Sequence, residues 1–224
     1  MNMKDRYMNV FNRLIQMEYN KIILYTISMV SPFLLGSCVT VGIEKPKYTV
    51  VEKQSEFEIR QYQSQIIAET TVEAEFDDAG DTAFQRLFDY ISGSNRTKKS
   101  IAMTAPVNQK SHSEKIAMTA PVNQQISEGN YSISFLMPSK YTMETLPEPL
   151  NPQVVIREIP SQKIAAIRYS GTWSQERYKA HQAKLEDFIR EKGLQAKGEP
   201  IFARYDPPFQ LWFLRRNEVL IPIY

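Results

Sequence analysis

The segment FEIRQYQSQIIA, residues 57–68, is matched 97 residues later by VVIREIPSQKIA, residues 154–165. Ile59-Arg60 of the first copy falls on Ile156-Arg157 of the second, and a Ser-Gln pair further along is shared as well. Both copies alternate and are rich in β-branched or aromatic side chains, which is typical of strands. The match predicts that one folding unit is used twice.

A helix is expected after each copy. In the second half it should cover roughly residues 174–192, opening at Ser174 as an N-cap and closing at Gly193. In the first half, apolar residues recur at helical spacing over residues 82–92, with Gly93 behind them. The apolar stripe of this first helix comprises Phe84, Leu87, Phe88 and Ile91.

The rest of the body is interpreted as strands. They are expected over residues 48–52 and 65–73, at IAMTAPV, over 131–138, and in PIFARY and LWFLRRNEVLIPI, with Arg215–Glu218 as the turn of the last hairpin. LPEPLNPQ, residues 146–153, indicates a linker between halves of about 47–145 and 153–224. The sequence thus predicts an α+β domain in which a strand–strand–helix–strand–strand unit is repeated with pseudo-twofold symmetry.

Residues 1–37 have the composition of a targeting segment. Four basic and two acidic residues precede an apolar run over residues 22–35, which is too short to cross a bilayer core and suits a signal peptide. Subtracting these charges from the 27 basic and 25 acidic residues of the chain leaves 23 of each. A neutral body gives no electrostatic reason to expect a nucleic-acid partner.

The apolar run leads into LGSC, residues 35–38, which resembles the lipobox of bacterial lipoproteins. In that class the Cys receives a lipid and becomes the new N-terminus, and several acyl chains anchor firmly. Cys38 is the single cysteine, so an internal disulfide is excluded. We therefore expect residues 1–38 to be a lipoprotein-type signal, 39–46 a tether, and the protein to face the periplasm, anchored by lipid to the outer membrane. A non-cleaved anchor or a buried N-terminal helix is the alternative.

The nine residues IAMTAPVNQ occur twice, at 101–109 and 116–124, separated by KSHSEK. The proline of each copy cannot donate to a ladder, so each suits a sheet edge or a strand end. Two interpretations stay open. The repeat is either a duplicated edge segment folded as a hairpin-like extension, or a ligand-facing flap that carries Met103 or Met118.

A set of motifs spread over the body now points to a family. FEIRQY, a helix ending in FDYISG, and then IAMTAPV, SFLMPSKY, YSGTW, RYDPP and RRNEVL occur in this order. They resemble the SOUL heme-binding protein family over about residues 47–223. The resemblance implies a distorted β-barrel with two long helices and an internal repeat. It also implies that a tetrapyrrole is bound, with heme as the cofactor.

Heme requires an apolar cleft, often an axial ligand, and basic groups near its propionates. The resemblance places heme against the first helix, which makes the stripe of that helix the candidate binding surface. Its members are Phe84, Leu87, Phe88 and Ile91. Plain core packing is the alternative interpretation of the same four side chains.

The candidate iron ligands are few. Gln61 stands where the family carries a proposed histidine ligand, and glutamine binds iron poorly. His112 lies in a polar loop. His181 shares a helical face with Tyr178 and Leu185, so it is either a packed, hydrogen-bonded residue or a heme ligand.

The propionate partners also depart from the family. Asp81, Asp89 and Gln210 occupy positions where other members carry basic residues, and acids repel propionates. The resemblance therefore implies weak or non-axial heme binding in this chain.

The sequence lacks a recognisable catalytic constellation. No nucleophile–base pair, Gly-rich phosphate loop or Cys/His metal spacing stands out, so an enzyme is not expected. The first hypothesis is a membrane-anchored protein that binds heme or another tetrapyrrole. The second is an effector-binding or interaction module, resembling gyrase-inhibitor-like domains, that binds other apolar small molecules.

Overall fold

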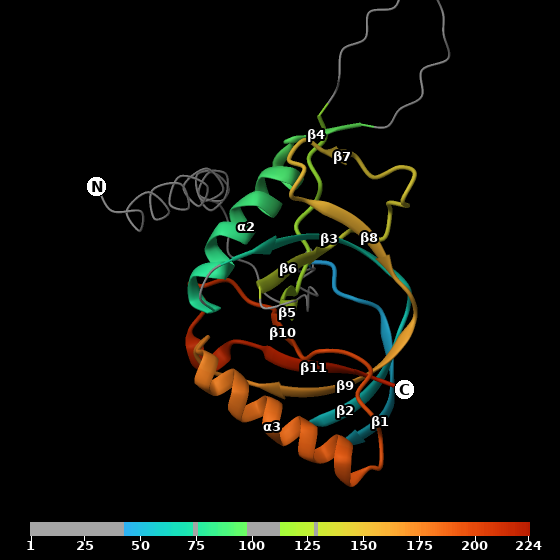
Figure 1. The fold of residues 1–224 in the computed structure, drawn as a ribbon, viewed down its shortest axis with the longest axis vertical. Coiled ribbons are helices and arrows are strands. Elements are labelled where there is room, and N and C mark those ends of the chain that lie inside the picture. The colour runs from blue at the N-terminus through green and yellow to red at the C-terminus, as the bar shows by residue number, and fades with distance from the viewer. Residues whose placement is uncertain (1–42, 74–75, 98–112, 128–129) are drawn as a thin grey trace, which may run out of the picture. The chain divides into compact units, whose positions relative to one another are not determined.

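The computed structural model describes residues 43–73, 76–97, 113–127 and 130–224 (Figure 1). The compact unit that contains them begins at Gly42. The predicted signal segment with Cys38, the first IAMTAPVNQ copy with Met103, and His112 of the segment that follows it lie outside the described residues. Within the described ranges, no helix has both the length and the apolar character needed to cross a membrane.

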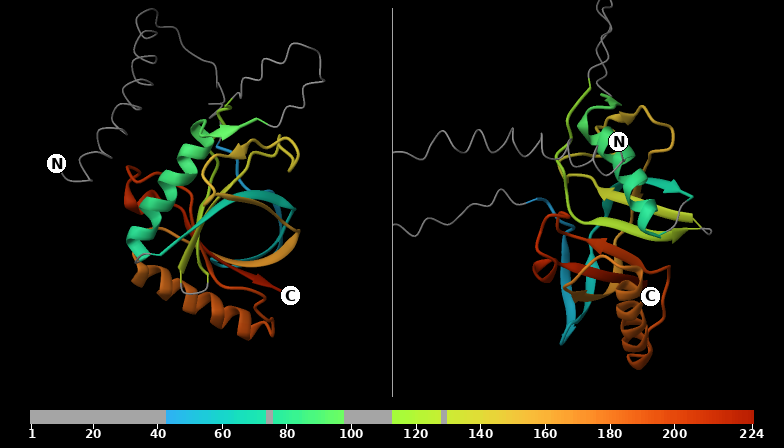
Figure 2. Two further views of the ribbon diagram at one scale, coloured as in Figure 1. Left: turned by 45° about the horizontal axis from the view of Figure 1, so that its top comes forward. Right: turned by 90° about the vertical axis from the view of Figure 1, so that its left-hand side faces the viewer.

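Nine strands form one antiparallel sheet in the order β1-β2-β9-β11-β10-β5-β6-β3-β8, and the sheet is strongly curled (Figures 1 and 2). The pair β4 (Asn95–Arg96) and β7 (Glu148–Pro149) forms a small second sheet. The large sheet is built from β1 (Tyr48–Gln54), β2 (Phe57–Tyr62), β3 (Gln65–Val72), β5 (Val122–Ser127), β6 (Asn130–Leu136), β8 (Val155–Ile159), β9 (Gln162–Tyr169), β10 (Ile201–Arg204) and β11 (Asn217–Ile223).

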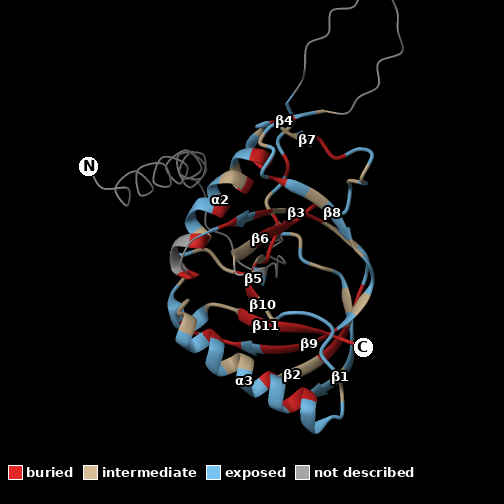
Figure 3. Cartoon of the chain, viewed as in Figure 1, coloured by how far each residue is buried: buried red, intermediate tan, exposed pale blue. Residues whose placement is uncertain are grey.

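Two 17-residue helices cover one face of the curl. α2 (Phe76–Ser92) packs on β3 and β6, and α3 (Gln175–Glu191) packs on β9 and β11. Figure 3 shows the buried strands β9 and β11 behind α3, whose outer side is exposed. The Ser174 hydroxyl accepts a hydrogen bond from the backbone N–H of Arg177 at 3.3 Å, which caps α3 as its position predicts.

Alternation along the strands separates two cores. On β9, Ala165 and Ile167 belong to the cluster beneath α3, whereas Ile164 and Ala166 belong to a cluster on the opposite, concave face. That concave cluster also contains Tyr62, Ala120, Ala203, Tyr205 and Leu220. The sheet therefore buries both faces, one under helices and the other inside its own curl.

The α+β class, the curled sheet and the two helices confirm the coarse sequence prediction. The barrel is open, because the strand order ends in β1 on one side and β8 on the other, and no ladder joins them in the described residues. The first helix begins at Phe76, six residues before the expected start at 82, since Phe76 itself is buried in the core beneath α3.

Two predicted strands are wrong. The expected strand over 211–223 is a strand only from Asn217, so Asn217 and Glu218 are buried strand residues and not a hairpin turn. Residues 205–216 form a loop that contains the short 3-10 helix η2 (Trp212–Leu214). In the second IAMTAPVNQ copy, residues 116–121 are irregular apart from a bridge between Thr119 and Glu44, and β5 starts at Val122.

Candidate functional site

A buried charged network lies on the concave face. Arg60 and Glu218 are 2% and 0% exposed, and the Arg60 guanidinium donates to both carboxylate oxygens of Glu218 at 2.7 and 3.0 Å. Arg216 donates to the same carboxylate at 2.8 and 3.0 Å, and the Tyr205 hydroxyl donates to it at 2.9 Å. One carboxylate thus holds two guanidinium groups, a charge-assisted arrangement with fixed geometry.

Strand alternation explains why these side chains meet. Arg60 and Tyr62 lie two residues apart on β2 and face inward, while Ile59, directly before Arg60, packs beneath α3. Glu218 on β11 faces inward, and its neighbour Val219 faces α3. The ladder of β2 with β9 and of β9 with β11 brings the two strands into reach of each other.

The charges in this network stabilise one another. Burial alone would raise the pKa of Glu218, but the hydrogen bonds and charges of Arg60 and Arg216 outweigh it and hold that pKa below its usual range. Burial alone would lower the pKa of Arg60, and the bond to Glu218 raises it instead. Burial raises the pKa of Tyr62 to about 12. The network is therefore ionised at neutral pH, with neutral tyrosines around it.

β1 covers the network. The guanidinium carbon of Arg60 lies 4.5 Å from the ring centroid of Tyr48, and the Tyr48 and Tyr62 rings are 4.9 Å apart. Arg216 donates to the Tyr48 hydroxyl at 3.4 Å. The tyrosine thus forms a lid over the buried charges, and it is also a wall of the cavity described next.

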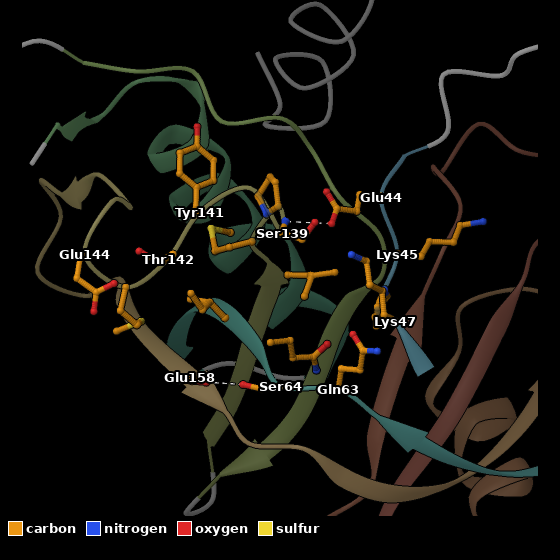
Figure 4. Close-up of a pocket in the computed structure, with 17 residues that line it drawn as sticks. Glu44, Lys45, Lys47, Gln63, Ser64, Ser139, Tyr141, Thr142, Glu144 and Glu158 are labelled. Atoms are coloured by element: carbon orange, nitrogen blue, oxygen red, sulfur yellow. Dashed lines mark hydrogen bonds between the residues drawn. The ribbon is translucent and has the colours of Figure 1, made fainter. Parts of the chain in front are cut away.

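Two adjoining cavities open above this network. One has a volume of about 350 Å³. The other, of about 340 Å³, is shown in Figure 4 between the segment that precedes β1, the turn after β2 and the segment after β6. Both lie at the lower end of the roughly 300–1,000 Å³ typical of ligand sites. They share the walls Lys45, Pro46, Lys47 and Gln63.

The lining differs between the two cavities. Besides the shared walls, the 350 Å³ cavity is lined by Tyr48, Tyr205 and Arg216, so it combines cations with aromatic rings. The 340 Å³ cavity adds the apolar Ile66, Leu136 and Met137 together with three acids. Those acids are Glu44, which accepts from the Ser139 N–H at 2.9 Å, Glu144, and Glu158, which accepts from the Ser64 hydroxyl.

The donors present decide which groups these cavities fit. Two exposed lysines, Lys45 and Lys47, stand on the shared wall and suit carboxylates such as heme propionates, whereas Arg216 is already paired with Glu218. Among the described residues, no histidine or cysteine lines either cavity. In the described part of the chain, no group of three or more His, Cys, Asp and Glu side chains could hold a metal ion.

The four predicted contacts on α2 divide into two kinds. Leu87 and Ile91 are buried in the core beneath α2, so the structure favours core packing for them. Phe84 and Phe88 are half-buried against the same cluster, with rings stacked at 6.0 Å. Only these two present apolar surface to a ligand. Met118 of the second IAMTAPVNQ copy packs against this cluster as well.

His181 is not brought together with the α2 side chains. Its ring stacks on Tyr169 of β9 at 3.8 Å between centroids, and its Nδ1 lies 2.7 Å from the Arg177 carbonyl. Tyr169 belongs to the core beneath α3, whereas the α2 residues belong to the core beneath α2. The stacked and hydrogen-bonded arrangement is the packed role that the sequence left open, and Nε2 is the ring nitrogen that a ligand could use.

Sequence reasoning missed the concave network. Its signals were present, because Arg60 occupies an inward position of an alternating strand and Glu218 interrupts the apolar run of NEVLIPI. A charge on an apolar strand face requires a partner when it is buried. The partner could not be named without knowing that β2 and β11 both flank β9.

Comparisons with known proteins agree with the motif resemblance. A family model described as SOUL heme-binding protein matches residues 43–222. The chain is similar to heme-binding protein 2 of Mus musculus, 27% identical over 79% of this chain and 88% of that protein. It is also similar to heme-binding protein 1 of Xenopus tropicalis, 24% identical over 79% of this chain and 94% of that protein.

Among solved structures, the fold resembles the crystal structure of the EcmrR C-terminal domain. The TM-score is 0.52 at 8% identity, covering 79% of this chain and 98% of that one. At this identity the similarity concerns the fold alone.

Proposed function

The chain belongs to the SOUL heme-binding protein family, and from this premise we propose that it binds heme or a related tetrapyrrole in the two joined cavities of the concave face. The observation that carries this assignment is the shared wall, where Lys45 and Lys47 stand between both cavities. Cations at this wall would receive the carboxylates of the ligand, and the half-buried Tyr48 offers aromatic surface to its ring.

The proposal includes weak or non-axial ligation. When bound, heme supplies an iron whose chemistry depends on its axial ligands. Among the described residues around the cavities, the groups that could bind iron are the three glutamate carboxylates, the phenols, and the thioethers of Met137 and Met143. Two of the carboxylates already accept hydrogen bonds from Ser139 and Ser64, and Met137 is 3% exposed. Retention of the ligand therefore rests on apolar contact and on the cationic wall.

The alternative binding position for the same ligand is the partly exposed apolar surface of α2. Phe84 and Phe88 form a half-buried stacked pair on this helix, against which the family resemblance places heme. The cations near this pair are less suitable, because Arg86 already donates to the Thr71 carbonyl at 3.3 Å. For this reason the concave cavities are the preferred site.

A hemin titration of the detergent-solubilised full chain separates the two positions. The double substitution Lys45→Glu and Lys47→Glu should weaken hemin binding about tenfold. Each exposed charge contributes somewhat less than about 1 kcal/mol, and a tenfold change in affinity corresponds to about 1.4 kcal/mol. Lys179→Glu, an exposed charge reversal on α3, is the matched control and should leave the affinity unchanged.

Loss of hemin affinity in variants of α2, with unchanged affinity in the lysine variant, would assign the site to α2. If the double substitution Phe84→Ser and Phe88→Ser weakens hemin binding and the double lysine substitution does not, the cavity assignment is wrong.

The Soret band should be the same in His181→Ala as in the unmodified chain, and a shifted band in that variant would mean that His181 ligates the iron.

A second candidate function is the binding of another apolar small molecule, as in an effector-binding or interaction module. Glu44, Glu144 and Glu158 line the 340 Å³ cavity, and acids favour a cationic or neutral ligand over a dicarboxylate. No Soret change with hemin, combined with thermal stabilisation by cationic apolar compounds, would favour this function. In both cases we propose binding and not catalysis.

We further propose that the protein is anchored to a membrane through Cys38, facing the periplasm and on the outer membrane. The LGSC sequence after an apolar run supports this location. Labelling with a radioactive fatty acid should mark the chain and should fail in Cys38→Ser. A labelled Cys38→Ser chain, or an unlabelled native chain, would disprove lipidation at this residue.

The internal repeat is likewise a proposal. Its support is that the strand order from β2 to β8 consists of two four-strand sets, β2-β9-β11-β10 and β5-β6-β3-β8. The second set mirrors the first, because each has one strand of one half at its outer end and three strands of the other half beside it. The sequence match at the 97-residue offset places β2 and β8 in equivalent positions of this order. A structural superposition of residues 57–136 on residues 154–223 tests it directly.

A further inference from the structure

The loop between β10 and β11 exposes a continuous run of large apolar side chains. Residues 207–214 read PPFQLWFL and contain no charged side chain. The exposed fractions of its five large apolar residues lie between 51% and 65%, which is far from the usual scattered pattern of single exposed apolar residues. These residues are Phe209, Leu211, Trp212, Phe213 and Leu214.

Several backbone groups of this loop are hydrogen-bonded within the protein. The Arg215 guanidinium donates to the Gln210 carbonyl at 2.8 Å and to the Pro208 carbonyl, and the Gly171 N–H donates to the Trp212 carbonyl at 3.1 Å. The Leu214 N–H donates to the Leu211 carbonyl at 2.9 Å. These bonds satisfy part of the loop backbone while its apolar side chains are exposed, which lowers the cost of bringing the segment into lipid.

The base of the loop is firmly attached to the body. The Arg215 guanidinium carbon lies 4.5 Å from the Trp173 ring centroid, and the Asp206 carboxylate accepts the Arg216 N–H at 2.5 Å. The apolar tip is therefore presented on a fixed support.

The loop lies on the same side of the body as the start of the described chain. Residues 45–48 and the loop-base residues Tyr205 and Arg216 line one cavity. In the right-hand view of Figure 2, the blue start of the described chain and the red loop before β11 are on the same side. Cys38 is seven residues before Lys45, a reach of at most about 25 Å. A lipid on Cys38 would hold this side close to the membrane.

We propose that residues 207–214 insert into the interfacial region of the lipid bilayer and give the body a second, non-covalent membrane contact. Trp and Phe are enriched at this depth of membranes because their rings suit the boundary between headgroups and acyl chains. Because the tip carries no charge, its insertion depends on apolar burial and not on anionic lipid. The inference rests on the proposed membrane location, and it is independent of where heme binds.

Trp212 makes this insertion measurable in the full chain. The chain has two tryptophans, and the other, Trp173, is partly buried at the loop base. The full chain is reconstituted into phosphatidylcholine vesicles with brominated acyl chains, and tryptophan emission is compared between the unmodified chain and Trp212→Phe. We expect blue-shifted Trp212 emission that the bromines quench, with the quenching lost in Trp212→Phe.

Matched variants test whether the apolar tip causes the quenching. The double substitution Phe213→Gln and Leu214→Gln should reduce the quenching of Trp212. The control is the double substitution Val50→Gln and Val51→Gln, which changes two exposed apolar residues of β1 and should leave the quenching unchanged. Adding phosphatidylglycerol to the vesicles should leave the quenching unchanged.

Three results would overturn the proposal. The first is Trp212 emission that aqueous iodide quenches equally with and without vesicles. The second is a blue shift that grows with protein concentration in the absence of vesicles, which would assign the loop to a contact between two copies. The third is quenching that requires anionic lipid. Loss of insertion with unchanged hemin titration would disprove this inference while leaving the tetrapyrrole function intact.

Discussion

Arg60 and Arg157 occupy equivalent positions of the two matching segments, yet their ion pairs have opposite environments. The side chains of Arg60 and Glu218 are 2% and 0% exposed, whereas those of Arg157 and Glu69 are 47% and 20% exposed. Both pairs are bidentate, and in both the arginine lies on the strand that opens its half of the match. The two sites share the same bidentate arginine–glutamate contact and differ in burial and in the further partners of the carboxylate, which at Glu218 are Arg216 and Tyr205.

The cause of this difference is one additional strand. β1 pairs with the outer side of β2, while β8 ends the sheet on the opposite side. Tyr48 of β1 covers Arg60, and residues 45–47 before β1 form the shared wall of the two cavities. Only one of the two matching segments is therefore enclosed. The cover is β1 together with residues 45–47, which follow the predicted membrane tether.

The largest effect is expected on breaking the buried pair. Glu218→Gln removes the charge that holds two guanidinium groups and turns an amide donor toward them. Leaving a buried arginine without its partner should lower the free energy of unfolding by about 3–5 kcal/mol. Urea denaturation followed by circular dichroism measures this. A loss below about 1 kcal/mol would mean that the network is solvated and that burial does not distinguish the two pairs.

Acid should weaken the same pair. The pKa of Glu218 is lowered in the folded chain, so its contribution is fully present above the ordinary carboxyl value of 4.5 and is lost as the pH falls through the lowered folded value. Stability should therefore decline below about pH 4.5, and more steeply in the unmodified chain than in Glu218→Gln. Urea midpoints measured between pH 7 and pH 3 test the difference in slope. Parallel curves for both chains would show that other carboxylates govern the acid response.

Removing the cover should have an intermediate effect. Tyr48→Ala deletes the ring over Arg60 and the hydroxyl that accepts from Arg216, and it should cost about 1–2 kcal/mol in unfolding free energy. The same change should weaken hemin binding, since Tyr48 lines the 350 Å³ cavity. Val51→Ala, an exposed residue of the same strand, is the matched control. Unchanged hemin affinity in Tyr48→Ala would separate the network from the ligand site.

Much of this architecture could be predicted from local patterns. The alternating pattern of the two matching segments predicted the strands β2, β3, β8 and β9, and helical spacing of apolar residues predicted α2 and α3. Both signals depend on residues that are close in sequence. The start of α2 was missed, since Phe76 is held by packing beneath α3 and not by the stripe of its own helix.

The parts that failed depend on distant partners. LWFL has the composition of a strand, but β10 is four residues long and its ladder with β11 ends at the pair Arg204 and Asn217. Residues beyond that pair have no strand to bond with there and form the exposed loop. Likewise, Arg60 and Glu218 are 158 residues apart, so no local pattern could join them. The placement of heme in the cavities, and not on Phe84 and Phe88, is a prediction that the hemin titration of the variants tests.

The smallest effect is expected at the exposed pair, and it tests the comparison from the other side. Glu69→Gln removes the negative charge and one of the two oxygens that accept from Arg157 at 2.5 and 2.9 Å, yet water can solvate the freed guanidinium because nearly half of that side chain is exposed. The loss of unfolding free energy should stay below about 1 kcal/mol and should shrink further in 1 M salt, which screens exposed charges. Urea midpoints at low and high salt measure both. A loss above about 2 kcal/mol that salt does not reduce would show that Arg157 depends on its partner as Arg60 does, and the cover provided by β1 would then no longer explain why the two halves differ.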